Sequence, residues 1–286
     1  MTRYAKPETV EEALAILAAG SWRVLAGGTD FYPALGAKPL RENILDINGL
    51  SELQGISHSE DGVVIGARTT WTDIVRHPLP PAFDALKAAA REVGSVQIQN
   101  TGTVAGNLCN ASPAADGVPA LMILDAEIEL RSTTGIRRLK LAEFTLGNRK
   151  TARRGDELVT AVRVPAGAIA GASAFVKLGA RRYLVISIAM AAARLAFDAD
   201  GRVASAAVAI GSCSAVAQRL PALEQALIGH GADPSIAGVV EPGHLAALSP
   251  IDDVRGSAAY RREAAREIVA RAVASAAHPM PETLVA

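Results

Sequence analysis

The sequence predicts an α+β protein built from two parts, and three observations support this class. Half of its 286 residues are hydrophobic, which is enough to bury a sizeable core in one large or two ordinary domains. Short apolar runs that end in turn residues are mixed with longer segments of helical periodicity, and in the last third of the chain the strands precede the helices. A run of small residues at 166–174, AGAIAGASA, is the best candidate for a domain boundary.

The first segment of the chain favours a helix followed by two strands. Residues 6–20 carry apolar side chains at helical spacing, with a proline near the start and a glycine at the end, which is typical of an amphipathic helix. The apolar run at 22–28 leads into a glycine turn and predicts a strand. Residues 43–48 predict the second strand.

The middle of the chain predicts strands and helices on either side of one glycine-rich segment. Residues 95–117 are rich in Gly, Asn, Ser and Thr but also contain Val, Ile and Leu, which favours an ordered loop over a linker. The expected strands cover 62–67, 127–133, 135–141 and 155–165. The expected helices begin at Thr70 or Thr72 and cover 83–94 and 118–126.

The last third of the chain predicts a small unit of three strands and two helices. The tetrapeptide DADG at 198–201 forms a natural turn between the second strand and the third. The expected strands cover 174–179, 187–198 and 203–212, and the expected helices cover 220–229 and 257–277.

Composition excludes several classes of function. The 29 basic and 29 acidic side chains give a formal net charge of zero, so the chain as a whole has no general attraction to nucleic acid or to an anionic membrane, which leaves a local basic patch open. Cys109 and Cys213 belong to no CxxC pair or Cys/His cluster, so the chain cannot ligate an iron–sulfur cluster or a structural zinc in the usual way. The charged N-terminal segment, the low cysteine count and the absence of an apolar run long enough to span a bilayer predict a cytoplasmic protein.

Two glycine-containing segments, AGGTDFYP at 26–33 and TVAGNLCNASPAAD at 103–116, are the candidates for chemistry. Each follows an apolar run, and glycine lets a ligand approach a bare backbone whose N–H groups can hold phosphate oxygens. Either segment alone also reads as a tight turn. Neither has the GxGxxG or the GxxxxGK[ST] spacing, and neither contains a lysine, so a diphosphate would rest on neutral amides, as suits a tightly held dinucleotide.

These two segments together closely resemble the FAD-binding loops of the medium flavoprotein subunit of molybdenum hydroxylases, the family of carbon monoxide dehydrogenase and xanthine dehydrogenase. The resemblance continues at 155–165, 175–189 and 252–262, so it covers nearly the whole chain. In the usual second loop a glycine stands where this chain has Ala105, which fits only if that position avoids a positive φ.

The resemblance implies a fold and a domain division. A two-lobed FAD-binding domain of the vanillyl-alcohol-oxidase type is expected at 1–166, with lobes at about 1–58 and 59–166. A smaller α+β domain with a three-stranded sheet and helices is expected at 171–286. FAD is expected to lie extended between the two lobes and this C-terminal domain.

The resemblance also implies roles for individual residues. The first loop would wrap the pyrophosphate, and the second would bind phosphate and ribityl oxygens. Asp116 would accept a hydrogen bond from a ribose or ribityl hydroxyl. Val159 or its neighbour Leu158 would pack on the adenine or flavin rings. Lys177 resembles the lysine that approaches the flavin from the second domain, where a cation favours the anionic reduced flavin. The expected cofactor-binding residues are Val24, Leu25, Ala26, Gly27, Gly28, Thr29, Asp30, Phe31, Thr103, Gly106, Asn107, Asp116, Val159 and Lys177.

Most of these side chains also have a plainer interpretation. Asp116 could only cap the helix expected near 118, Asn107 could bond its own loop, and Lys177 could be a surface lysine. Tyr183 could stack on the flavin, although core packing is the simpler role, and Cys109 suits a small buried filler. The basic run KTARR at 150–154 could contact an acidic partner or the adenine end of a nucleotide, or could simply be solvated.

The resemblance implies an FAD-dependent oxidoreductase subunit that is incomplete alone. A large partner would hold the molybdenum cofactor and a small partner two 2Fe-2S clusters, in a dimer of heterotrimers, and electrons would pass through FAD to NAD⁺ or another acceptor. The sequence offers no catalytic constellation and no metal ligands of its own. Two alternatives remain: a stand-alone flavin oxidase of the same fold, and a scaffold subunit that has lost flavin.

Overall fold

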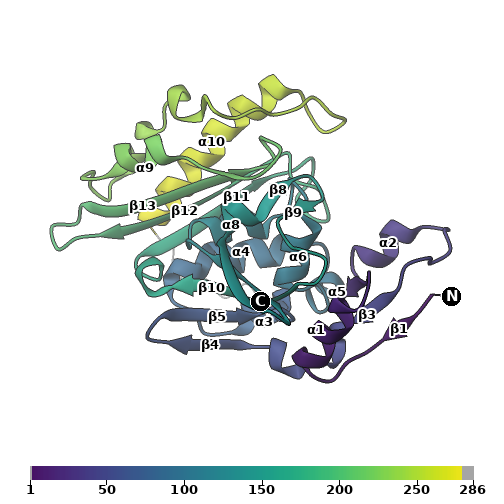
Figure 1. The fold of residues 1–286 in the computed structure, drawn as a ribbon. Coiled ribbons are helices and arrows are strands. Elements are labelled where there is room, and N and C mark those ends of the chain that lie inside the picture. The colour runs from purple at the N-terminus through teal and green to yellow at the C-terminus, as the bar shows by residue number, and fades with distance from the viewer. Residues whose placement is uncertain (1, 279–286) are drawn as a thin grey trace.

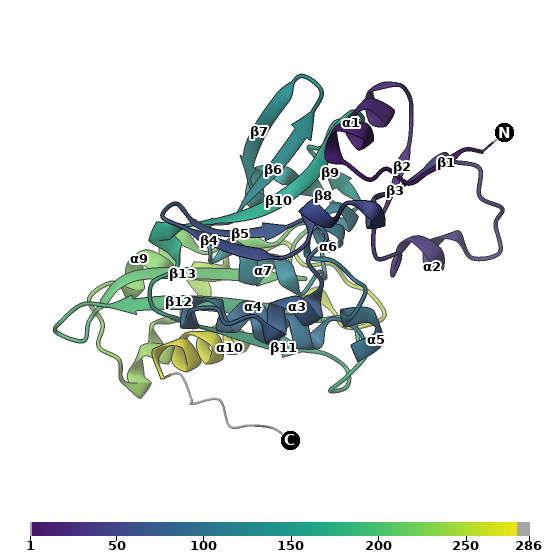
Figure 2. The same ribbon diagram turned by 90° about the horizontal axis from the view of Figure 1, so that it is seen from below.

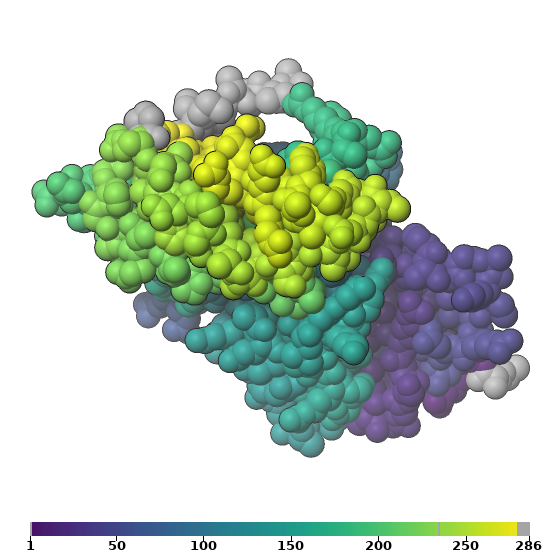
Figure 3. All heavy atoms as spheres, turned by 90° about the horizontal axis from the view of Figure 1, so that it is seen from above, coloured from purple at the N-terminus to yellow at the C-terminus, as the bar shows by residue number. Residues whose placement is uncertain are grey.

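The computed structural model describes residues 2–278, whose helices and strands form three units around two large hydrophobic cores and one small one (Figure 1). The N-terminal unit comprises residues 2–50, the middle unit residues 54–167 and the C-terminal unit residues 172–278. Figure 3 shows the N-terminal unit (purple) and the C-terminal unit (green to yellow) on different sides of the middle unit (teal). Residues 279–286, which the expected C-terminal domain includes, lie outside the described residues.

The N-terminal unit is a parallel sheet of three short strands in the order β1-β3-β2. The predicted first helix is confirmed as α1, and it begins after Thr9, whose side chain accepts a hydrogen bond from the N–H of Glu12. A second helix, α2, follows the first glycine segment and was not predicted. The elements are β1 (Tyr4–Ala5), α1 (Val10–Ala18), β2 (Arg23–Leu25), α2 (Phe31–Leu35) and β3 (Ile44–Asp46).

The middle unit contains an antiparallel sheet of five strands in the order β4-β5-β10-β6-β7. Strand β4 (Ile56–Ser59) was not predicted, and the expected lobe boundary near 58 falls inside it. Strand β10 (Leu158–Pro165) is buried along most of its length because both of its faces are covered, so it is apolar almost continuously rather than at alternate positions. The other strands are β5 (Gly62–Gly66), β6 (Glu127–Ser132) and β7 (Gly135–Lys140).

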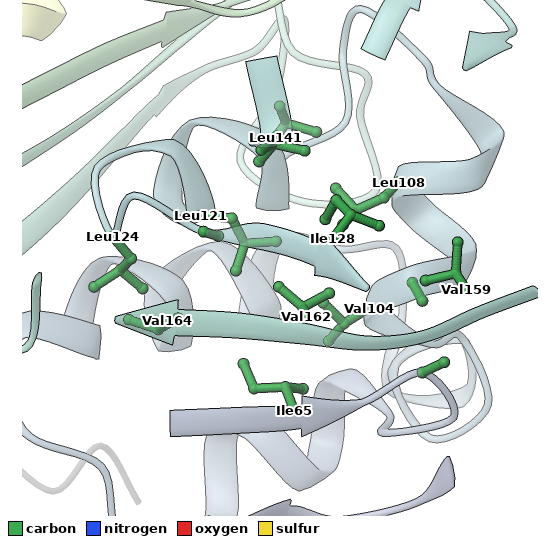
Figure 4. Close-up of a cluster of buried hydrophobic side chains, with 14 of the residues drawn as sticks. Ile65, Val104, Leu108, Leu121, Leu124, Ile128, Leu141, Val159, Val162 and Val164 are labelled. Atoms are coloured by element: carbon green, nitrogen blue, oxygen red, sulfur yellow. The ribbon is translucent and has the colours of Figure 1, made fainter. Parts of the chain in front are cut away.

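Short helices pack on this sheet and fill the space between it and the C-terminal unit. Figure 4 shows side chains of β5, β6 and β10 meeting those of α6 and α7 in the core. The segment 95–117, expected as an ordered loop, contains the two short helices α5 and α6. The helices are α3 (Trp71–Arg76), α4 (Asp84–Glu92), α5 (Val96–Gln99), α6 (Val104–Asn110), α7 (Gly117–Met122) and α8 (Leu141–Phe144).

A two-stranded hairpin, β8 (Thr145–Gly147) and β9 (Lys150–Thr151), projects from the middle unit beside α6. Its turn consists of Asn148 and Arg149, and Arg149 has a φ of 58°. The N–H of Arg149 donates to the carbonyl of Ala111 at the end of α6 (2.9 Å). The hairpin is therefore fixed to the second glycine segment.

The C-terminal unit is an antiparallel sheet that helices cover on both faces (Figures 1 and 2). The long helix α10 (Ala258–Ala277) and α9 (Pro221–Leu227) cover one face, and α4 and α7 of the middle unit contact the other. The three predicted strands are confirmed, and the short β14 adds a fourth strand at the edge. The strands are β11 (Ala172–Leu178), β12 (Ala189–Phe197), β13 (Val203–Gly211) and β14 (Gln218–Arg219).

Candidate functional site

A cleft of about 810 Å³ opens between the N-terminal and the middle units, and both glycine segments line it. We call it the glycine-loop cleft. Its volume lies within the range of about 300–1,000 Å³ that is usual for small-molecule and cofactor sites. Its walls come from residues 21–31 and 41–47 on one side and from 67–159 on the other, so folding brings together two parts of the chain that are far apart in sequence.

The first glycine segment presents bare backbone to this cleft. Gly28 has a φ of 72°, and a Cβ added to Gly27 would lie 1.8 Å from the carbonyl oxygen of Thr101, so neither position accepts a side chain without strain or displacement. In the described part of the chain, the N–H groups of Gly27, Gly28, Thr29 and Asp30 have no hydrogen-bond partner. Four successive donors are thus available to a ligand.

The first part of the second glycine segment is the helix α6 rather than a loop. The side chain of Thr103 caps this helix and accepts a hydrogen bond from the N–H of Gly106 (3.0 Å), and a Cβ at Gly106 would crowd that hydroxyl. Ala105 has no positive φ, so alanine is accommodated where the usual loop has glycine. The side-chain oxygen of Asn107 is buried without a hydrogen-bond partner among the described residues.

Arginine side chains add positive charge to the glycine-loop cleft. Arg149 and Arg153 reach it from the hairpin region, and Arg23 and Arg41 from the N-terminal unit. Only two carboxylates line it, so its formal charge has an excess of two positive charges. Arg153 donates to the carbonyls of Arg154 and Glu157 and makes no ion pair among the described residues. The cleft is therefore suited to an anion.

Most of the expected site residues line this cleft. Leu25 is an exception because it is buried against Phe31 and Ile44 beneath the cleft surface. The residues that line it as expected are Val24, Ala26, Gly27, Gly28, Thr29, Asp30, Phe31, Thr103, Gly106, Asn107 and Val159.

Asp116 and Lys177 lie outside the glycine-loop cleft and pair with each other. The Nζ of Lys177 donates to Oδ2 of Asp116 (2.7 Å), and the hydroxyl of Ser187 donates to Oδ1 (2.5 Å). Burial raises the pKa of Asp116, although the Lys177 cation and the two hydrogen bonds oppose this. Asp116 makes no capping bond to α7, and the Lys177 side chain is only 7 % exposed, so the cap and surface-lysine interpretations are both wrong.

Lys177 also borders a smaller hollow of about 350 Å³. Glu92 lies there with Arg181 and Arg182, and the Nζ of Lys177 also donates to the carbonyl of Glu92 (3.3 Å). The pair of Asp116 and Lys177 thus lies where β11 of the C-terminal unit meets α4 of the middle unit, at the residue that precedes α7.

Two other side chains are placed differently from the simpler interpretations. Tyr183 is 62 % exposed and is not packed in the core, and the guanidinium of Arg182 lies over its ring, 5.2 Å from the ring centroid. Cys109 is exposed on the wall of the glycine-loop cleft, whereas Cys213 is buried in the C-terminal unit. The role of buried filler therefore belongs to Cys213 and not to Cys109.

Sequence reasoning missed the part of the cleft that other segments contribute. The stretch before the first loop supplies Trp22 and Arg23, and the hairpin supplies Arg149. The basic run at 150–154 was the only signal for that wall, and two of its members, Thr151 and Arg153, line the cleft.

The described residues contain no candidate metal site and no candidate membrane-spanning helix. Among residues 2–278, no group of three or more His, Cys, Asp or Glu side chains could hold a metal ion. His58 and His77 do meet at the surface, with their Nε2 atoms 3.4 Å apart. No helix in the described range is both long and apolar enough to cross a bilayer.

Family models divide the chain in two. Residues 1–167 match the FAD binding domain in molybdopterin dehydrogenase, and residues 174–276 match the CO dehydrogenase flavoprotein C-terminal domain.

Named relatives agree with these matches. The chain is 38 % identical to the nicotinate dehydrogenase FAD-subunit of Eubacterium barkeri over 64 % of each chain, just under two thirds of that subunit. It is 32 % identical to the glyceraldehyde dehydrogenase medium chain of Sulfolobus acidocaldarius, over 94 % of this chain and 96 % of the relative. A solved chain of carbon monoxide dehydrogenase from Hydrogenophaga pseudoflava superimposes with a TM-score of 0.86 at 30 % identity, covering 96 % of each chain.

Proposed function

The chain belongs to the FAD-binding subunits of the molybdenum hydroxylase family, and on this premise we propose that it holds FAD in the glycine-loop cleft and carries electrons within a larger complex. The observation that carries the proposal is the set of unpartnered amides at 27–30 in a cleft with excess positive charge. Each phosphate of the FAD diphosphate is an anion, so donors and charge match this part of the cofactor.

The residues of the cleft fit the rest of the cofactor as well. The unpartnered oxygen of Asn107 can accept a hydrogen bond from a ligand hydroxyl, and Leu158 and Val159 provide an apolar wall for a ring. We assign the diphosphate to residues 26–30 and the phosphate or ribityl oxygens to Thr103, Gly106 and Asn107.

We assign Asp116 and Lys177, which lie outside the glycine-loop cleft, to the flavin end of a site that would extend from this cleft toward the C-terminal unit. Each oxygen of a carboxylate accepts more than one hydrogen bond, so Asp116 can bind a ribityl hydroxyl while it keeps its bonds to Lys177 and Ser187. Bound FAD supplies the redox chemistry, and the cation of Lys177 stabilises negative charge on the ring system. The chain itself binds, orients and tunes the cofactor.

We further propose that the chain acts with two partners. A large partner would hold the molybdenum cofactor and a small one the 2Fe-2S clusters, in a dimer of heterotrimers located in the cytoplasm, with NAD⁺ or another compound as the final acceptor. Two relatives are an FAD-subunit and a medium chain of dehydrogenases, which supports the division into subunits. The substrate would then be oxidised on the large partner and would not contact this chain.

Titration of the purified chain with FAD and with FMN tests the proposal. We expect FAD to bind without a covalent bond and to be released on denaturation. FMN should bind much more weakly because it lacks the adenosine monophosphate half and therefore has one phosphate in place of the diphosphate. A chain that binds neither would favour a scaffold that has lost flavin. A flavin-loaded chain that oxidised an organic substrate by itself, without partners, would favour a stand-alone oxidase.

A further inference from the structure

Arg149 connects the two glycine segments, although it belongs to neither. Its backbone N–H donates to the carbonyl of Ala111, which follows α6 within the second segment (2.9 Å). Its side chain reaches Asp30, which precedes α2 within the first segment, with Nη1 2.6 Å from Oδ2 and Nη2 3.3 Å from Oδ1. Both side chains are about half exposed, and both residues line the glycine-loop cleft. The contact is a two-pronged arginine–carboxylate pair, which fixes direction as well as distance.

The position of Asp30 makes this contact more than a link between two units. Asp30 directly follows Gly27, Gly28 and Thr29, whose free N–H groups are the donors expected to hold a diphosphate. A carboxylate at the end of such a loop repels an anion, and the repulsion over a few ångströms is appreciable even when solvent screens it. The Asp30 side chain makes no capping bond to α2, so capping does not explain its presence.

We propose that Arg149 is a positioning residue that neutralises Asp30 and thereby lets the first glycine segment accept the diphosphate of FAD. This inference rests on the proposed function. Arg149 would act through Asp30, because both of its Nη atoms are directed to that carboxylate. Arg153, which lines the same cleft without an ion pair among the described residues, is by contrast available to an anion directly.

The same contact could instead be a simple bridge between the N-terminal and the middle units, and the two roles predict opposite effects of double substitution. In a simple bridge, loss of either partner breaks the same bond, and loss of both is no better than loss of one. In the neutralising role, Arg149→Gln exposes the charge of Asp30 to the diphosphate, and removing that charge with Asp30→Asn restores binding.

The test is FAD affinity, measured by flavin fluorescence titration of the apoprotein for the wild type, Arg149→Gln, Asp30→Asn and the double variant. We expect Arg149→Gln to bind FAD about tenfold more weakly, a loss typical of one uncompensated charge. Asp30→Asn should bind FAD at least as well as the wild type, and the double variant should return to within about threefold of it. Arg271→Gln, which breaks an exposed ion pair with Glu267 on α10, is the matched control and should leave FAD affinity unchanged.

Two results would overturn the proposal: an unchanged affinity in Arg149→Gln, or a loss in Arg149→Gln that the double variant does not recover, whatever the affinity of Asp30→Asn. Failure of the wild type itself to bind FAD would overturn the proposed function and this inference together, and so differs from either result. Thermal unfolding of each apoprotein shows whether a variant is folded. The double variant carries both substitutions, so its recovery of binding also excludes a loss of fold as the cause.

Discussion

Lys177 and Asp116 form a buried ion pair, and the loss of either partner should lower the free energy of unfolding by more than one hydrogen bond contributes. Both side chains are less than a tenth exposed, and Lys177 is the cation closest to the carboxylate. Removal of one member of a buried pair commonly costs about 3–5 kcal/mol, because the other charge stays buried without compensation. We therefore expect Lys177→Met to be strongly destabilised, and Lys177→Met/Asp116→Asn to regain part of that loss.

The pH dependence of this variant follows from the direction of the Asp116 pKa. Burial raises that pKa in the folded protein, so the folded state binds the proton more tightly than the unfolded state does. The free energy of unfolding therefore falls as the pH rises above the unfolded pKa of about 3.9. Loss of Lys177 raises the folded pKa further. Thermal unfolding at several values between about pH 4 and pH 7 should show a deficit of Lys177→Met against the wild type that grows with pH. A stability deficit of Lys177→Met that stays constant over this pH range would contradict a role of Lys177 in stabilising the Asp116 carboxylate.

At the scale of secondary structure, β11 supplies a cap for a helix of another unit. Helix α4 lacks a side-chain cap of its own, and the hydroxyl of Ser173 on β11 accepts a hydrogen bond from the N–H of Ala85 (2.8 Å) and donates to the carbonyl of Ala82 (2.8 Å). Ser173 is buried, so no water can replace it without rearrangement. The middle and the C-terminal units are thus joined by polar contacts as well as by packing.

Ser173→Ala should leave the Ala85 N–H buried and unpaired, at a cost of about 1–3 kcal/mol. Denaturant unfolding measures this loss, and Ser205→Ala, on an exposed position of β13, is the control and should change stability by less than about 0.5 kcal/mol. FAD affinity should stay the same in both variants, because neither side chain lines the glycine-loop cleft. Equal stability of the two variants would show that the capping bond contributes nothing.

The elements that could be predicted from sequence are those with a clear burial pattern. The long helix expected at 257–277 is α10, and the strand expected at 203–212 is β13, because the apolar positions of both face one core. Strand β4 could not be predicted because only Ile56 is even half-buried, and its position depends on pairing with β5. Helix α6 was hidden because Gly and Asn favour loops, whereas the Thr103 cap and buried side chains stabilise it.

For the candidate site, the backbone part could be predicted and the charged part could not. Glycines beside hydrogen-bonding residues mark a close approach of ligand to backbone, and that signal is local in sequence. The ion pair of Arg149 and Asp30 joins residues that are 119 positions apart, and no sequence motif contains both of them. The pairing of Asp116 with Lys177 likewise appears only when the sheet of the C-terminal unit packs on α4 and α7.

At the scale of the whole molecule, the glycine-loop cleft is the feature on which the function depends, and its walls come from two units. FAD bound there would cover the wall residues of both. Cys109 is exposed on this wall, whereas Cys213 is buried in the C-terminal core at 1 % exposure. The two cysteines of the chain thus provide a chemical probe of the cleft and an internal control.

The most direct test of the central claim is the rate at which a maleimide reagent modifies Cys109, followed by mass spectrometry with and without FAD. Desolvation by the cleft wall raises the pKa of the Cys109 thiol to about 11, so the labelling is run at one fixed, mildly alkaline pH and only the rates with and without FAD are compared. We expect Cys109, assigned by peptide mapping, to be the thiol that reacts in the apoprotein, and its rate to fall sharply when FAD saturates the protein. Cys213 should stay unmodified until denaturation. FMN at the same concentration should protect far less. An FAD-saturated protein whose Cys109 reacts as fast as in the apoprotein would show that the cofactor binds elsewhere and would contradict the account.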